Sequence, residues 1–241
     1  MNIRGFILLL LTIAGMTVLP ELAGAQSLAD SGNSSSAEVS TSRVTTQPQL
    51  VLTYSRPTEK TKLHNYFFDT FGPYPIVGAA VVAGINQYEG TPPEWNQGAE
   101  GYGRRVGSNF AIAGISTTTR YALAKAFRED TLYYRCECKH FFPRLSHAVL
   151  STFTSRRGDD GHRVFSFPAL VAPYAGTMTA AYAWYPDRYN AKDGFRMGNY
   201  SLLGYIGGNI ALEFLYSGPH SLISRMHLNN GHGAPDPGSP R

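Results

Sequence analysis

Long runs without a charged side chain are the feature that most limits how this sequence can fold. The longest extends from Val164 to Pro186, and a second covers residues 197–212. A third, residues 73–88, consists mainly of small and β-branched side chains. Runs of this length are typical both of membrane-spanning helices and of helices surrounded by protein, and abundant Ala, Gly, Thr and Tyr make the longest run only weakly hydrophobic. Both interpretations remain open at this point.

Small residues within the apolar segments recur at the spacing of a helix. One stripe runs at steps of four, three, four and four residues: Gly107, Ala111, Gly114, Thr118 and Ala122. Such spacing is typical of helices that approach each other closely, whereas a membrane β-barrel would show a period of two. We therefore expect a close helix contact at Gly114. Gly204 and Gly208 repeat the pattern four residues apart.

These patterns predict a mainly α fold. We expect a single compact bundle of small-residue-rich (Gly/Ala) helices that is embedded in a membrane or associated with one. The expected helices cover residues 60–71, 74–88, 104–127, 144–154, 168–184 and 198–216.

The first 25 residues have the three parts of a secretory signal peptide. Arg4 precedes an apolar run from Phe6 to Leu19, and an Ala-x-Ala site ends at Ala25. We predict cleavage after Ala25 and export to the bacterial cell envelope, in the periplasm or at a membrane, including the outer membrane; an uncleaved N-terminal anchor is the alternative.

Two polar segments flank the part of the chain that can form a core. Residues 26–58 are rich in Ser, Thr and Gln, and residues 218–241 contain several Asn, Gly and Pro. Such composition buries too little apolar surface to offset the entropy lost on ordering, so we expect a disordered leader and a disordered tail. The helical domain is then expected over residues 59–217.

The charge balance limits the class of partner. The formal net charge is +4, with basic residues dispersed among acids. This pattern does not form the basic patch that nucleic acids require, but it is compatible with weak attraction to an anionic membrane. We expect membrane lipid as a partner, with a second copy of the chain or another envelope protein as further possibilities, and no nucleic acid and no cofactor.

The two cysteines, Cys136 and Cys138, are separated by one residue. Three states are open: a local disulfide, intermolecular pairing, or free thiols. His140 lies close in sequence, but three candidate ligands without a fourth make a poor metal site, and we expect none.

The segment from Pro92 to Arg105 combines acids, bases, aromatic residues and glycines beside an apolar helix. We expect it to be a turn region whose charges pair with one another or with a ligand, because unpaired buried charges are costly. Its candidate site residues are Glu94, Trp95, Glu100, Tyr102, Arg104 and Arg105.

Two further candidates come from other segments. His147 lies in a short apolar stretch, where it is either a hydrogen-bonded core residue or a base. Glu213 interrupts an apolar helix, and we expect it to pair with Arg104, Arg105 or Arg120.

Several short motifs together resemble a family of uncharacterised bacterial exported proteins. They are Phe71-Gly72-Pro73, Pro92-Pro93-Glu94-Trp95, Glu100-Gly101-Tyr102-Gly103-Arg104-Arg105 and Trp184-Tyr185-Pro186. The resemblance covers most of residues 60–217. It implies an envelope location and a shared compact domain, and it brings no assigned reaction and no catalytic residues. The Cys-x-Cys pair is where we expect this chain to depart from that family.

Two functional hypotheses follow. In the first, the protein is a non-catalytic envelope protein with a structural, assembly or binding role at a membrane. In the second, it is an enzyme acting on a lipid or phosphate-bearing amphiphile, and its site is the cluster Glu94, Glu100, Arg104, Arg105 and His147. The sequence contains no Gly-x-Ser-x-Gly, His-Glu-x-x-His or Walker motif.

Overall fold

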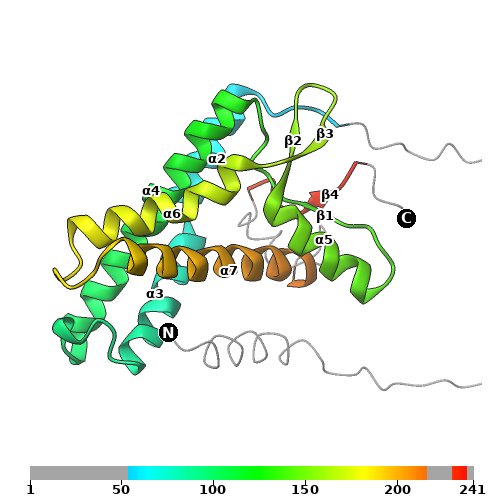
Figure 1. Ribbon diagram of the computed structural model, residues 1–241. Helices are drawn as coiled ribbons and strands as arrows, with labels where there is room; N and C mark the ends of the chain where they lie inside the picture. Colours follow the sequence, from blue (N-terminus) through cyan, green and yellow to red (C-terminus); the bar gives the residue numbers. More distant parts are fainter. Residues whose placement is uncertain (1–53, 216–229, 238–241) are drawn as a thin grey trace, which may run out of the picture. The chain divides into compact units, whose positions relative to one another are not determined.

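A computed structural model describes residues 54–215 and 230–237, and helices dominate this part of the chain (Figure 1). The helices are α2 (Glu59–Phe71), α3 (Pro73–Tyr88), α4 (Gly98–Phe127), α5 (Phe141–Phe153), α6 (Phe167–Ala183) and α7 (Ala191–Leu215), with a 3₁₀ turn η1 (Pro93–Trp95). The strands are β1 (Tyr134–Arg135), β2 (Thr154–Arg157), β3 (His162–Phe165) and β4 (Ala234–Pro235). The mainly α fold is confirmed. The signal peptide expected over residues 1–25 lies outside the described residues.

The long helices pack in a row: α3 on α4, α4 on α6, and α6 on α7. Phe127 at the end of α4 contacts Phe167 at the start of α6, with ring centroids 6.1 Å apart. Trp95, just before α4, contacts Tyr185, just after α6, at 5.0 Å. Helices α4 and α6 are therefore antiparallel, and the short connections 89–97 and 184–190 meet at one end.

We call this end of the bundle the loop end and the opposite end, which carries the short strands, the strand end (Figure 1). Helix α5 lies at the strand end and packs on α7. Strands β2 and β3 form an antiparallel hairpin, with Thr154 opposite Phe165. The turn between these strands covers residues 158–161.

The distribution of buried residues is inverted relative to that of an ordinary water-soluble domain. In the described ranges no leucine, valine, phenylalanine or methionine is buried. The buried class consists mainly of Ala, Gly, Ser, Thr and Pro, together with a few charged residues. In α2 the buried side chains are Asn65 and Thr70, while Leu63, Phe67 and Phe71 are exposed. These three large apolar side chains therefore face outward.

Two sequence-based boundaries differ from the structure. Helix α4 starts at Gly98 instead of residue 104, so Glu100 to Arg105 lie in its first two turns. Helix α7 starts at Ala191 instead of residue 198. The first turns of α4 contain glycines and charges that we interpreted as part of a turn region. Position 101 has no room for a side chain, because α4 passes close to the preceding loop: a Cβ on Gly101 would lie 2.4 Å from the carbonyl oxygen of Trp95.

The expected close contact at Gly114 is wrong. A Cβ at Gly114 would meet only the Thr70 methyl group at 3.8 Å, which is ordinary van der Waals contact. Positions Gly204 and Gly208 face open space. The close approaches are elsewhere: a Cβ at Gly176 would lie 2.3 Å from Ser116 Oγ.

Part of the segment expected to be a disordered tail packs against the domain. Strand β4 runs parallel to β1, and the Asp236 amide donates to the Arg135 carbonyl at 2.9 Å. His232 Nε2 lies 3.1 Å from both carboxylate oxygens of Asp69, and its Nδ1 accepts from the Tyr133 amide at 3.1 Å. Specific polar contacts thus hold residues 230–237 although the segment has little apolar surface.

Candidate functional site

Polar side chains gather at both ends of the helix bundle. The first group lies at the loop end, around Arg105. This arginine is 1% exposed. Its guanidinium donates to the carbonyl oxygens of Thr91, Pro92 and Asn96 at 2.8–2.9 Å and to Gln87 Oε1 at 2.6 Å. All four acceptors are neutral oxygens. Arg105 therefore fastens the connection between α3 and α4 to the first turns of α4.

The other charged residues of this motif are on the surface. Arg104 and Glu100 form an ion pair of 2.7 Å between consecutive turns of α4, and both are exposed. Glu94 pairs instead with Arg188, 2.5 Å away, from the connection between α6 and α7. The expectation that the four charges pair with one another is thus correct only for Glu100 and Arg104.

The two aromatic candidates of the motif have packing roles. Trp95 lies on Tyr185, and the Tyr102 hydroxyl donates to the Ala80 carbonyl at 3.2 Å. Together with the Glu94–Arg188 pair, these contacts join α3, α4 and the α6–α7 connection at the loop end.

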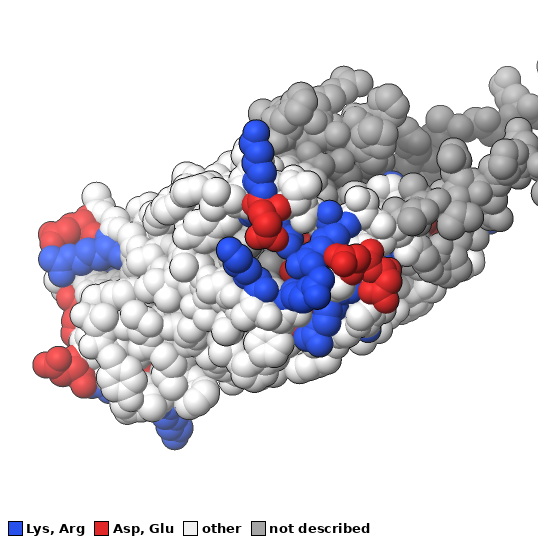
Figure 2. All heavy atoms as spheres, turned by 90° about the horizontal axis from the view of Figure 1, so that it is seen from above, with Lys and Arg blue, Asp and Glu red and all other residues white. Residues whose placement is uncertain are grey.

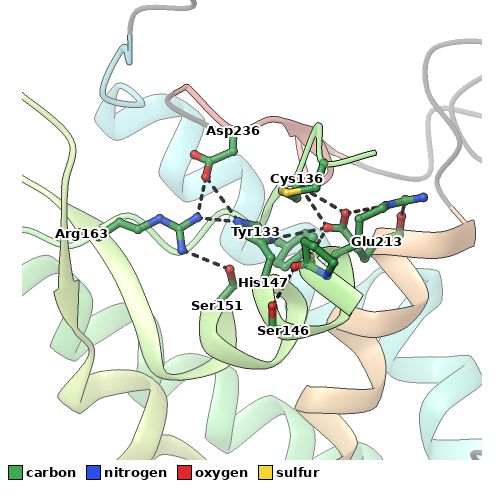
Figure 3. Close-up of a disulfide and its surroundings, with 11 residues drawn as sticks. Tyr133, Cys136, Ser146, His147, Ser151, Arg163, Glu213 and Asp236 are labelled. Carbon is green, nitrogen blue, oxygen red and sulfur yellow. Dashed lines mark hydrogen bonds and ion pairs between the residues drawn. A yellow bond between two sulfur atoms is a disulfide. The ribbon is translucent and has the colours of Figure 1, made fainter. Parts of the chain in front are cut away.

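The second polar group lies at the strand end and is centred on Glu213 of α7 (Figure 3). Its side chain is 0% exposed. It accepts from the Tyr133 hydroxyl at 2.5 Å, from the Cys136 amide at 3.1 Å and from Arg144 Nε at 3.1 Å. Arg144 also donates to the Glu213 carbonyl. The expected pairing of Glu213 with Arg104, Arg105 or Arg120 is therefore wrong, and Arg144 of α5 takes that place.

His147 of α5 lies between Glu213 and Asp236. Its Nδ1 is 3.6 Å from Glu213 Oε2, and its Nε2 is 3.3 Å from Asp236 Oδ2. Arg163 Nη2 is 2.7 Å from the same Nε2 and 2.6 Å from Asp236 Oδ2, and Arg156 also donates to Asp236. Figure 3 shows the imidazole between the two carboxylates, with Arg163 on the side of Asp236.

The electrostatics of this centre favour charged forms of the acid and of the imidazole. Burial lowers the pKa of His147, but a hydrogen bond with Asp236 and the nearby Glu213 carboxylate outweigh it, so the net shift is upward. Burial raises the pKa of Asp236, but hydrogen bonds from His147 and Arg156 hold it well below its usual range. Burial and then the bond to Glu213 raise the pKa of Tyr133, which keeps this phenol a donor.

The polar side chains of this centre contact one another: Tyr133 and Arg144 donate to Glu213, and Arg163 donates to Asp236. A protonated His147 ring donates from Nε2 to Asp236, while its Nδ1 lies 3.6 Å from Glu213, beyond hydrogen-bond distance; a neutral ring accepts from Arg163 at Nε2. In either form the polar atoms are oriented toward one another.

Of the residues predicted for the site, only His147 and Glu213 belong to this second centre. The motif from Glu94 to Arg105 lies at the loop end, whereas α5, which carries His147, lies at the strand end (Figure 1). Sequence reasoning missed Tyr133, Arg144, Arg163 and Asp236. The two arginines had a signal, because they lie close to the borders of apolar segments, but Asp236 lay in the expected tail.

Neither a metal cluster nor a relative identifies the function of this centre. Across residues 54–215 and 230–237, no group of three or more His, Cys, Asp and Glu side chains is placed to hold a metal ion. No protein-family model, curated protein or solved structure matches the chain.

Proposed function

We propose that this protein is a non-catalytic envelope protein whose helical domain is embedded in a membrane, where it has a structural or binding role. The proposal rests on the burial pattern: small and polar side chains are buried, and large apolar side chains are exposed. Large apolar side chains are normally among the most buried in water-soluble proteins. Helices in a membrane instead pack through small and polar residues and direct large apolar side chains toward lipid.

The charge-free runs lie side by side in the fold. Residues 73–88, 106–119, 167–183 and 197–212 carry no charge and belong to α3, α4, α6 and α7, which pack in that order. At about 1.5 Å per residue they form a belt of roughly 21 to 26 Å. An average bilayer core is about 30 Å thick, and the bacterial outer membrane is thinner.

Charged residues on the surface lie mainly on either side of this uncharged belt. Figure 2 shows Lys, Arg, Asp and Glu gathered in two groups, one toward the loop end and one toward the strand end, with uncharged surface between them. Charges at both ends of an apolar belt are the arrangement expected of a protein whose two ends lie in water.

One helical stretch of the described residues, Glu59–Tyr88, is long and apolar enough to cross a membrane by length and composition. Core helices of soluble proteins meet the same criterion, but they are mostly buried. Here only 17% of the most apolar window is buried. Exposed Ile76, Val77 and Val81 lie on α3 without cover from the described residues.

The arrangement of charges favours a structural role over the enzyme alternative. That alternative needs His147 close to Glu94, Glu100, Arg104 and Arg105. The four motif residues are at the loop end, and His147 contacts residues of the strand end. The polar groups that an amphiphile would have to meet in one place are thus divided between two places.

The proposal is tested by fractionation of cells that produce the full chain. We expect the protein in the membrane fraction after washing with alkaline carbonate and its release by detergent. Recovery in the soluble fraction without detergent would overturn the proposal.

A pair of substitutions separates a lipid-facing surface from a water-facing one. Val77 is 60% exposed within the uncharged run of α3, and Tyr88 is 93% exposed at the end of that helix. We expect Val77→Asp to reduce the membrane-inserted fraction, because a carboxylate in hydrocarbon is costly, and Tyr88→Asp to leave it unchanged. Equal tolerance of both substitutions would indicate that α3 faces water.

A further inference from the structure

The Cys136–Cys138 pair forms a local disulfide, one of the three states that the sequence left open. These are the only cysteines of the chain. A cross-link that closes so short a loop removes little entropy from the unfolded chain, because the entropic stabilisation grows with loop length. The disulfide is therefore a weak structural restraint, and another role must be considered.

The loop that contains the disulfide is held by other contacts. On its N-terminal side β1 pairs with β4. The Cys136 amide itself donates to Glu213, which is held in turn by Tyr133 and Arg144. On the C-terminal side α5 begins at Phe141. These contacts do not involve the sulfur atoms, so the loop can keep its course when the disulfide opens.

The two sulfur positions differ in access. Cys136 is 5% exposed, whereas Cys138 is only half-buried. Thiol–disulfide exchange requires an attacking thiolate to reach one sulfur atom, and access selects which one. Cys138 is therefore the position for an incoming thiolate, and Cys136 is the protected partner.

A lysine and a histidine follow Cys138 directly in the sequence. Lys139 and His140 are both exposed. Glu137, between the cysteines, forms an ion pair of 2.8 Å with Arg135, which offsets its negative charge. Neighbouring cations lower the pKa of a thiol, and a thiol with a lower pKa leaves faster in exchange.

We propose that Cys136–Cys138 is a redox-active centre that exchanges with thiols of other envelope proteins. A partner thiolate attacks Cys138 Sγ, the bond to Cys136 breaks, and Cys136 leaves as a thiolate. A second thiolate of the same partner then attacks the partner's sulfur atom in the mixed disulfide, and Cys138 leaves as a thiolate. The partner is oxidised to a disulfide, the pair gains two electrons, and two protons from the partner thiols or from water convert it to the dithiol. Exchange with another disulfide reverses these steps.

This activity is independent of the membrane role proposed above. A soluble protein with the same loop would show it, and a membrane protein without it would still fractionate with membranes.

The first test titrates the purified, detergent-solubilised protein with dithiothreitol and counts alkylated thiols by intact mass. We expect two thiols to become reactive while the far-ultraviolet helix signal is unchanged. If the thiols appear only in denaturant, or only together with loss of the helix signal, the disulfide is structural and the proposal fails.

The second test compares the two single variants in their reaction with glutathione disulfide. Cys136→Ser leaves the accessible thiol and should form the mixed disulfide at least about 10-fold faster than Cys138→Ser, which leaves the buried one. Equal or reversed rates would contradict the assignment of Cys138 as the attacked sulfur. If either variant fails to fold, the titration of the native chain still decides whether the pair is redox-active.

The neighbouring cations provide a matched comparison. Lys139→Gln, made in the Cys136→Ser variant, should slow mixed-disulfide formation several-fold at neutral pH, because less Cys138 is ionised. Lys125→Gln removes an exposed lysine from the end of α4 and should leave the rate unchanged. An equal effect of both substitutions would mean that Lys139 has no specific influence.

Discussion

At the scale of single residues, two adjacent arginines have opposite environments. Arg104 is exposed and pairs with Glu100, whereas Arg105 is buried and donates to four neutral oxygens. Four donors in a fixed planar fork match these acceptors, and a lysine ammonium cannot reproduce them. Arg105 is therefore the residue on which the conformation of the loop end depends most.

We predict that Arg105→Lys destabilises the domain by about 2 to 4 kcal/mol, because it leaves buried carbonyl oxygens without donors. Thermal and denaturant unfolding in detergent measure the change. The matched control, Arg104→Lys, should stay within about 0.5 kcal/mol, since an exposed pair contributes little. Similar losses for both variants would show that Arg105 is not the more important of the two.

His147 gives the domain a pH dependence with a defined sign. Its pKa is raised in the folded protein by a hydrogen bond with Asp236 and by the nearby Glu213 carboxylate, which outweigh burial. The protonated ring therefore stabilises the fold fully below its unfolded pKa of about 6.5, and this contribution is lost as the pH rises through the higher folded value. Asp236, whose pKa is lowered, stays ionised over this whole range.

The expected result is a melting temperature that decreases from about pH 6 toward pH 8, and a flatter profile for His147→Gln. Exposed His64 provides the control, because His64→Gln should keep the slope of the unsubstituted protein. An unchanged slope in His147→Gln would assign the pH dependence to another group.

The contact partners of individual residues were the feature that the sequence predicted least well. Asp236 lies 89 positions from His147, and nothing in the composition of residues 218–241 indicates that one acid there is buried. The same holds for Arg105, whose acceptors are mostly backbone carbonyls. Such partners depend on how the backbone runs in three dimensions, and the types of neighbouring residues in the sequence do not indicate that course.

At the scale of elements, the sequence predicted all six helices, although α4 and α7 start six and seven residues before their predicted first residues, 104 and 198. Charge-free runs bounded by Gly, Pro and charges define where helices can extend. The same periodicity shows which residues share a face, but it does not show which face is inside. The stripe that contains Gly107 and Gly114 is one such case, because the buried face of α4 contains Ser108, Ile112 and Ser116 instead.

The contact between α4 and α6 provides a prediction at this scale. A Cβ at Gly176 would lie 2.3 Å from Ser116 Oγ and 2.5 Å from the Ile112 carbonyl oxygen. Gly176→Ala should therefore lower stability by about 1 to 3 kcal/mol through overpacking.

The control for this prediction is Gly204→Ala in α7, a position that faces open space. Alanine there should leave the melting temperature unchanged or raise it, because it favours the helix by roughly 1 kcal/mol over glycine. Thermal unfolding of both variants in the same detergent makes the comparison. Destabilisation by Gly204→Ala would reveal a packing partner for this face.

At the scale of the whole molecule, the uncharged belt separates two sets of charged residues. The loop end carries Lys192 in the first turn of α7, and the strand end carries Lys125 in the last turn of α4. If the helices cross a membrane as we propose, these two lysines lie on opposite sides of it. If the domain lies flat on one surface, both lysines are on the same side.

Lysine labelling in sealed native membrane vesicles distinguishes these arrangements. We expect a membrane-impermeant amine reagent to modify Lys125 or Lys192 but not both, and to modify the second after detergent opens the vesicles. Lys60 is exposed at the start of α2, and its neighbour Glu59 interacts electrostatically with Lys125. Lys60 should therefore be modified under the same conditions as Lys125, which provides an internal control. Modification of Lys125 and Lys192 together in intact vesicles would contradict a spanning domain, since a reagent excluded by the hydrocarbon core reaches both ends only when both lie on one side.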